Sequence, residues 1–149
     1  MHTTQRAEFF TRTAAAARPW RTALWTSRVL GTLAVLFLVF GSIGKLLELQ
    51  PVITGSAQLG YPPDTGFPIG VILLVCVAAY VFPPTSVLGA VLLTGYLGGA
   101  VATHVRVGNP LLTHTLFPVY VGALIWGALL LRDARLRTLF PWRVGERRQ

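Results

Sequence analysis

Long apolar runs separated by short polar breaks dominate the pattern along the chain. The runs cover approximately residues 28–49, 66–82, 86–105 and 113–131. The hydrocarbon core of a bilayer is about 30 Å thick, and a helix needs about 20 residues to cross it. Each run reaches or approaches that length. The pattern therefore predicts an all-α integral membrane protein, built as a bundle of four spanning helices.

Proline and glycine mark the breaks between these runs. Pro51 is expected to stop the first helix, and a loop with Gly and Pro is expected over residues 50–66. A Pro-Pro pair ends the second run sharply, and a tight turn before Pro110 separates the third run from the fourth. Pro118 lies inside the fourth run, where a membrane helix tolerates it but is expected to bend.

The composition excludes a water-soluble fold. Hydrophobic residues make up 53% of the 149 residues, charged residues only 12%, and the mean hydropathy is +0.60. Soluble domains carry about 25% charged residues, so this chain has too little charge to cover a surface in water. The lipid bilayer is therefore its first expected partner.

Basic residues are concentrated at the two ends of the chain. Of the 13 basic residues, five precede residue 29, six follow residue 131, and only Lys45 and Arg106 lie between. A stripe that binds nucleic acid would be continuous, so the net charge of +8 indicates anionic lipid head groups and no nucleic acid. Cytoplasmic segments are enriched in Lys and Arg. Because four spans put both termini on one side, we expect the N- and C-termini in the cytoplasm.

These features divide the chain into three segments. Residues 1–27 form a basic cytoplasmic segment, in which an Ala run and two Trp favour an interfacial helix over residues 14–27. Residues 28–131 form the transmembrane domain, and residues 132–149 form a basic cytoplasmic tail. The first run lacks a small-residue cleavage site, so we expect it to stay in the protein. Frequent Arg, Ala, Gly and Pro are typical of a GC-rich bacterial genome.

Small residues on the third run predict a helix-packing surface. Lipid tails are as apolar as Leu, so helices in a bilayer associate through close contact rather than hydrophobic transfer. Gly95, Gly98, Gly99 and Ala102 lie close together on one side of this run. We expect this surface to pack inside the bundle, and a homodimer interface is the alternative.

Four ionisable residues lie near the ends of the first and third runs. Lys45 and Glu48 close the first run, and His104 and Arg106 close the third. The expected topology puts all four at the outer surface of the membrane. Each alone is typical of a side chain that reaches the interface, and Lys45 with Glu48 has the spacing of a helical ion pair. Together they favour a basic pocket at the mouth of the bundle.

Such a pocket suits a quinone head group or a small anion. Tyr96, beside the third-run glycines, is a further candidate ligand contact, with helix packing as the alternative. His104 and His114 have no Cys and few carboxylates nearby, so no metal is expected. Cys76 is the only cysteine, which excludes an intramolecular disulfide and dithiol chemistry.

Several segments resemble the DoxX-like family. The matching segments are FLVFGSIGKLLEL, LGYPPDTGFPIGVILL, GAVLLTGYLGGAVATHVRVGNP and WGALLLRDARLR, of which GYLGGAVATHVR is the most specific part. The resemblance covers approximately residues 28–137. It implies a multi-pass, four-helix protein of the bacterial inner (plasma) membrane, with Lys45 and His104 at polar positions typical of the family. The family name comes from a subunit linked to thiosulfate:quinone oxidoreduction, and other members are similar to partners of membrane redox complexes.

Three functions are consistent with these features. The first is a subunit or small-molecule-binding component of a membrane redox system, which holds a quinone or small anion in the outer polar cluster and contacts a redox partner protein. The second is a non-catalytic membrane partner or chaperone that recruits another protein through its small-residue faces. The third is a small transporter, which is disfavoured because the span centres carry no carboxylate for proton coupling. The sequence leaves open whether the chain is an enzyme.

Overall fold

The computed structural model describes residues 18–133, 135 and 136, and this part of the chain contains no strand. Four helical stretches are long and apolar enough to cross a membrane; they are Thr22–Leu46, Pro63–Val81, Pro83–Arg106 and Leu111–Arg132. The prediction of an all-α protein with four membrane-spanning helices is confirmed. Most of the two basic ends, including residues 14–17 of the expected interfacial helix, lies outside the described residues.

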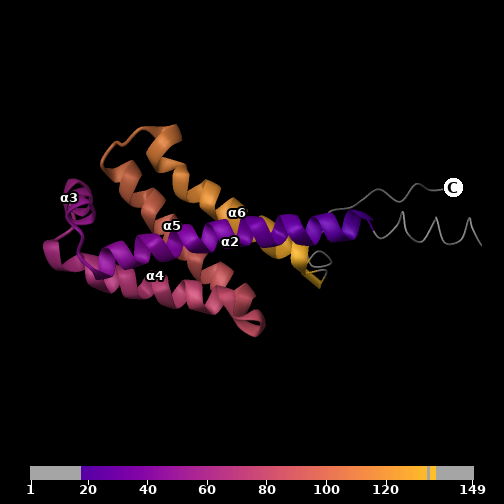
Figure 1. Ribbon diagram of the computed structural model, residues 1–149. Coiled ribbons are helices and arrows are strands. Elements are labelled where there is room, and N and C mark those ends of the chain that lie inside the picture. Colours follow the sequence, from indigo (N-terminus) through magenta and orange to yellow (C-terminus); the bar gives the residue numbers. More distant parts are fainter. Residues whose placement is uncertain (1–17, 134, 137–149) are drawn as a thin grey trace, which may run out of the picture.

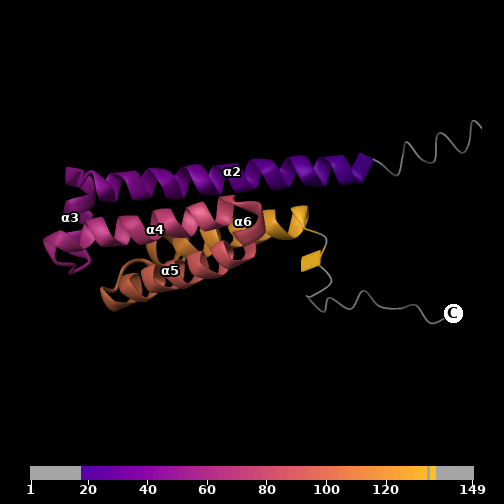
Figure 2. The same ribbon diagram turned by 90° about the horizontal axis from the view of Figure 1, so that it is seen from below.

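The spanning helices run alternately up and down. The α-helices of the described part are α2 (Arg18–Leu46), α3 (Gln50–Gln58), α4 (Gly66–Val81), α5 (Ser86–Arg106) and α6 (Phe117–Arg132). Short 3-10 turns, η1 (Pro63–Thr65) and η2 (Pro83–Thr85), lead into α4 and α5, and a π-helical turn, η3 (Leu111–Thr115), precedes α6. Helix α2 packs against α4 and α6, and α5 packs against the same two helices (Figure 1). The start of α2 and the end of α6 lie at the same end of the bundle (Figure 2).

The first helix differs from its predicted bounds at both ends. It begins at Arg18 and ends at Leu46, rather than spanning residues 28–49. Residues 18–27 therefore continue the spanning helix and form no separate interfacial helix. Packing explains this continuation, because the buried Ser27 hydroxyl donates a hydrogen bond of 2.7 Å to the Ala128 carbonyl of α6.

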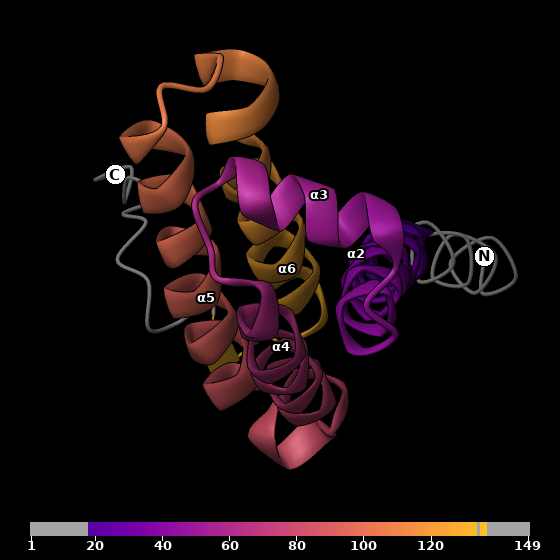
Figure 3. The ribbon, with the colours of Figure 1, turned by 90° about the vertical axis from the view of Figure 1, so that its left-hand side faces the viewer.

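The expected loop over residues 50–66 contains helix α3, which the sequence analysis did not predict. Pro51 does not stop a helix but lies in the first turn of α3. Proline favours that position because its fixed φ suits a helix and its missing N–H would have no partner there. The chain turns between α2 and α3 at Glu48, whose φ of 48° is in the left-handed region. Figure 3 shows α3 lying across the end of the bundle.

Pro118 does not lie in the interior of a helix, where it was expected to bend the fourth span. Helix α6 starts at Phe117, so Pro118 lies in its first turn, where proline is tolerated. The fourth span changes direction before this point, at the π-helical turn η3, which ends at Thr115.

The interior of the bundle is mainly apolar, while many large apolar side chains face outward. Phe40 is 76% exposed and Leu36 60% exposed, which is favourable only where lipid replaces water. The buried core draws on all four long helices and includes Ala34, Leu38, Leu73, Cys76, Val77, Ala90, Leu93, Val121, Ile125 and Leu129.

Hydrogen bonds between helices supplement this packing. Side-chain donors on one helix reach an acceptor on another at 2.7 to 3.1 Å. The pairs are Ser27 with the Ala128 carbonyl, Ser42 with the Gly70 carbonyl, Tyr80 with the Ile125 carbonyl, and Trp126 with the Thr94 hydroxyl. Within the described residues, no buried side-chain nitrogen or oxygen lacks a partner. Hydrocarbon offers no replacement partner, so each of these bonds favours the observed helix arrangement.

The glycines that bring helices together are not the ones expected. Gly95, Gly98 and Gly99 of α5 are exposed, and a Cβ added at any of them would meet no atom of another helix or loop within 4 Å. The expectation that they pack inside the bundle is wrong, because the buried side of α5 instead carries Ser86, Gly89, Ala90, Leu93 and Leu97. Close contact instead occurs at Gly70 and Gly89. A Cβ at Gly70 would lie 2.9 Å from Lys45 Cβ, and one at Gly89 would overlap the Tyr80 backbone.

We predict that Gly89→Ala destabilises the bundle by about 1–3 kcal/mol, because the added methyl group forces α4 away from α5. Thermal unfolding in detergent measures this change. Gly95→Ala is the matched control and should leave stability equal or slightly higher, since Ala is the better helix former. Equal unfolding temperatures for the two variants would contradict the proposed close contact.

Candidate functional site

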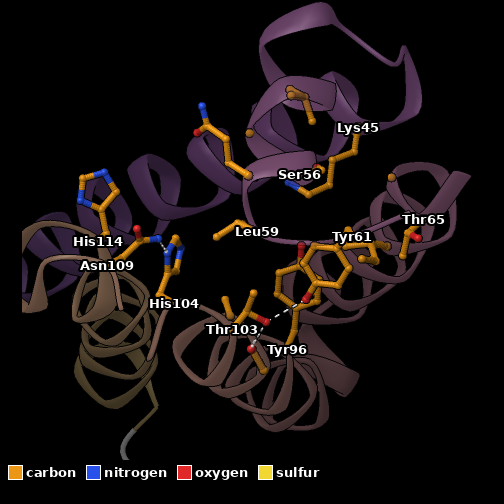
Figure 4. Close-up of a pocket in the computed structure, with 17 residues that line it drawn as sticks. Lys45, Ser56, Leu59, Tyr61, Thr65, Tyr96, Thr103, His104, Asn109 and His114 are labelled. Atoms are coloured by element: carbon orange, nitrogen blue, oxygen red, sulfur yellow. Dashed lines mark hydrogen bonds between the residues drawn. The ribbon is translucent and has the colours of Figure 1, made fainter. Parts of the chain in front are cut away.

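A cavity of about 590 Å³ lies at the end of the bundle that α3 crosses. Its walls come from the last turn of α2, from α3 and the segment after it, from the start of α4, from the second half of α5, and from the α5–α6 connection. The side chains that Figure 4 labels are Lys45, Ser56, Leu59, Tyr61, Thr65, Tyr96, Thr103, His104, Asn109 and His114. The cavity therefore joins segments that are far apart in the sequence.

Helix α3 roofs this cavity and is held at both of its ends. At its start, Val52 packs against Gly44 of α2, where an added Cβ would lie 3.2 Å from the Val52 side chain. Just beyond its end, the Arg106 guanidinium donates a hydrogen bond of 2.6 Å to the Leu59 carbonyl. α3 has no fully buried residue. These contacts, rather than a core of its own, fix its position.

Tyr61 ties the segment after α3 to α5. Its hydroxyl lies 2.8 Å from the Thr103 hydroxyl, which in turn donates to the Gly99 carbonyl one turn earlier in α5. The single hydroxyl proton of Thr103 is therefore donated within α5, and Tyr61 is the donor in the hydrogen bond between Tyr61 and Thr103. This orders the Tyr61 ring at the wall of the cavity (Figure 4).

Lys45 supplies the positive charge of the cavity. It lies in the last turn of α2, is partly buried, and lines the cavity beside Ser56 of α3 (Figure 4). The absence of a side chain at Gly70 lets α4 approach the Lys45 stem closely. Among the described residues, the ammonium group has no hydrogen bond or ion pair. A cation that is partly removed from water and has no protein partner is a strong donor to a ligand.

The ion pair suggested by the spacing of Lys45 and Glu48 is not formed. That spacing brings side chains together only on a continuous helix, and α2 ends at Leu46. With its left-handed backbone, Glu48 is exposed and lines only a smaller neighbouring cavity of about 80 Å³, which shares Lys45, Val52 and Ser56 with the large one.

Two histidines lie at the α5–α6 side of the cavity. The ring centroids of His104 and His114 are 6.1 Å apart. The Asn109 amide nitrogen lies 2.8 Å from His104 Nδ1. An amide NH₂ can only donate, so Nδ1 accepts and Nε2 of a neutral imidazole keeps its proton. His104 therefore offers a second donor to the cavity.

The α5–α6 connection orders this side of the cavity. Gly108 has a φ of 70°, which lets the chain reverse directly after α5. The Thr115 hydroxyl then donates to the Asn109 carbonyl at 3.2 Å. His114 lies in the π-helical turn η3, a geometry that is frequent at functional sites.

The structure brings together three of the five candidate ligand residues. Lys45, Tyr96 and His104 all line the large cavity, whereas Glu48 and Arg106 do not. Because α5 continues through Arg106, that residue points away from the face that carries His104. Its observed role is to hold α3.

The α3 residues and Asn109 were not predicted from the sequence as parts of the cavity wall. A proline directly after a helix end, which is typical of a new first turn, was the available signal for α3. No local signal marks Asn109, because only the turn geometry brings it to His104.

The cavity combines donors with apolar surface. Its polar side chains are uncharged apart from Lys45 and the titratable histidines, and no carboxylate lines it within the part of the chain that the structure describes. Leu59, Ile69 and the ring of Tyr96 supply apolar area. This combination suits a flat or compact ligand that is rich in hydrogen-bond acceptors or negatively charged.

Comparison with known families gave one match. The model of the DoxX-like family matches residues 29–128, which is more than half of the chain and includes all of the residues that line the large cavity. Comparisons with curated proteins and with solved structures gave no match.

We predict that Arg106→Ala loosens α3, because the variant removes the charge-assisted hydrogen bond to the Leu59 carbonyl. Hydrogen exchange of the α3 amides should become about fivefold faster, as expected for the loss of about 1 kcal/mol. Arg135→Ala removes an exposed arginine from the opposite end of the bundle, outside both cavities, and is the control. Unchanged α3 exchange in Arg106→Ala would contradict the role of this contact.

Proposed function

The chain belongs to the DoxX-like family of membrane proteins, and from this we propose that it is a ligand-binding subunit of a bacterial inner-membrane redox system. It binds a quinone-like or small anionic molecule in the cavity under α3. The observation that carries this proposal is the Lys45 ammonium group, which lines a cavity that holds no carboxylate among the described residues.

The charge balance of the cavity selects the class of ligand. A cation near the end of a membrane span is costly unless a partner or water solvates it. Lys45 has no protein partner among the described residues, so an acceptor or anion in the cavity would gain a strong hydrogen bond. A cationic ligand would gain no such contact and would be repelled.

A quinone head group fits these residues. Its ring is flat and apolar, which suits Tyr96, Leu59 and Ile69, and its carbonyl oxygens are acceptors for Lys45 and His104. A volume of about 590 Å³ is within the usual range for small-molecule sites, about 300–1,000 Å³. When bound, a quinone supplies two-electron redox chemistry. The residues of this chain would bind and orient it and would shield it from water beneath α3.

The orientation of the protein follows from its basic ends. Both ends belong to the cytoplasm by the positive-inside rule, and the start of α2 and the end of α6 lie at one end of the bundle (Figure 2). The cavity is at the opposite end and therefore opens at the periplasmic surface. Such a site can exchange ligands with the outer leaflet or the periplasm.

A second candidate function is the recruitment of another membrane protein. The observation that favours it is the open face of α5, where Gly95, Gly98 and Ala102 are exposed to the surroundings of the bundle. Small residues let a second helix approach closely. The helix on this face would belong to a redox partner or to a second copy of the chain.

We predict that Lys45→Met weakens binding of ubiquinone-1 to the purified protein at least about tenfold, because the charged donor is lost. Calorimetric titration in detergent measures the affinity, with sulfate as the small-anion probe in a parallel titration. Glu48→Gln is the control, since Glu48 lies outside the large cavity. Folded wild-type protein that binds neither probe would contradict the proposed function.

The proposed orientation predicts the pattern of surface labelling. Cysteines introduced at Thr54 in α3 and at Arg135 lie at opposite ends of the bundle, and both positions are exposed. A membrane-impermeant maleimide should label Thr54→Cys in intact spheroplasts and Arg135→Cys only after permeabilisation. The buried Cys76 stays unlabelled and provides the background. The reverse pattern would place the cavity in the cytoplasm.

A further inference from the structure

A second cavity lies at the other end of the bundle, away from α3. It has a volume of about 270 Å³ and is formed by α2, α4 and α6. Its polar side includes Arg28, Thr32 and Arg132, and its apolar side includes Val35 and Val81. We call this site the arginine groove.

The two arginines of the groove carry charge that no described carboxylate neutralises. The Arg28 guanidinium lies 6.0 Å from the centre of the Trp25 ring, and that of Arg132 lies 5.6 Å from the centre of the Tyr80 ring. Neither forms an ion pair within the described residues. Ring faces stabilise a cation only partly, so two positive charges at one groove still favour an anion.

Asp133 is the carboxylate nearest to the groove in sequence. Its Oδ1 accepts the backbone N–H of Arg135 at 2.9 Å, and among the described residues it forms no ion pair with Arg28 or Arg132. The remaining polar atoms of the groove are satisfied as well. The Ser27 hydroxyl donates to the Ala128 carbonyl, and the Tyr80 hydroxyl donates to a carbonyl of α6. Binding capacity therefore lies with the two guanidinium groups and Thr32.

The position of the groove along the spans points to a lipid. Arg28 lies six residues into the first span, which begins at Thr22, and Arg132 is the last residue of the fourth. Long basic side chains at such depths reach toward the head groups. Helices α4 and α6 both have their C-terminal ends here, and the partial negative charge of these ends disfavours an anion. The two arginines must therefore supply the attraction for an anion.

The apolar side of the groove continues toward the middle of the membrane. Val35 and Leu36 follow Thr32 on α2 in the direction of the bundle centre, and Val81 faces them from the end of α4. A free phosphate ion would leave this surface unused. A molecule with an anionic head and an acyl chain would cover both parts.

We propose that the arginine groove binds one anionic phospholipid from the leaflet on the side of the chain termini. The phosphate lies between Arg28 and Arg132 with the Thr32 hydroxyl beside it, and one acyl chain lies along Val35 and Leu36. This site is separate from the cavity under α3 and does not rest on the function proposed for that cavity.

Native mass spectrometry of the detergent-released full-length protein tests the proposal. Phosphatidylglycerol should bind as one tight adduct, at least about tenfold more tightly than phosphatidylcholine. The double variant Arg28→Gln/Arg132→Gln should lose this preference, because both charge-assisted contacts are removed. Thr32→Trp keeps both charges but fills the groove, and it should remove the adduct. Thr32 is exposed, so this second variant is expected to fold.

Arg135→Gln is the matched control, since it removes one positive charge at the same end of the bundle but outside the groove. Its affinity for phosphatidylglycerol should stay within about twofold of wild type. Three results would overturn the proposal: equal binding of the two lipids, an equal loss in Arg135→Gln, or displacement of the lipid by millimolar inorganic phosphate. The last result would show that the site recognises a free anion.

Discussion

The absence of water from the bilayer core is the constraint on which the rest of this structure depends. Backbone groups there must pair within helices, and a polar side chain must find an acceptor inside the protein. Ser27 and Ser42 do so by donating to carbonyls of neighbouring helices. Because apolar surface gains nothing by leaving lipid for a helix interface, these bonds and the contacts at Gly70 and Gly89 decide which helices lie side by side.

The requirement that polar groups pair inside the protein is weaker at the ends of the bundle, and both candidate binding sites are found there. At one end, α3 covers a space in which the Lys45 ammonium and a nitrogen of His104 have no described partner. At the other, Arg28 and Arg132 border a groove without a neutralising carboxylate among the described residues. The core satisfies its own polar groups, whereas the ends keep donors that a ligand or a lipid can use.

The two ends differ in the ligand that they favour. The cavity under α3 is roofed and combines donors with aromatic surface, which suits a compact head group that enters from the interface. The arginine groove runs along the helices, which suits an acyl chain as well as an anion. Helix α3 causes this difference, since among the described residues it lies across the end that holds the large cavity (Figure 3).

The sequence by itself determined the all-α membrane fold and the number of spans, because the length of an apolar run and the scarcity of charge are local properties. It also placed Lys45 and His104 at one end, because both close outward-running spans. Tertiary structure alone decided which side of α5 faces the core, and it left Gly95 and Gly99 exposed against expectation. Tertiary structure also determined that α3 covers the large cavity and that Arg106 and Glu48 do not line it. These outcomes depend on contacts such as Arg106 with Leu59, whose partners meet only after the helices have packed.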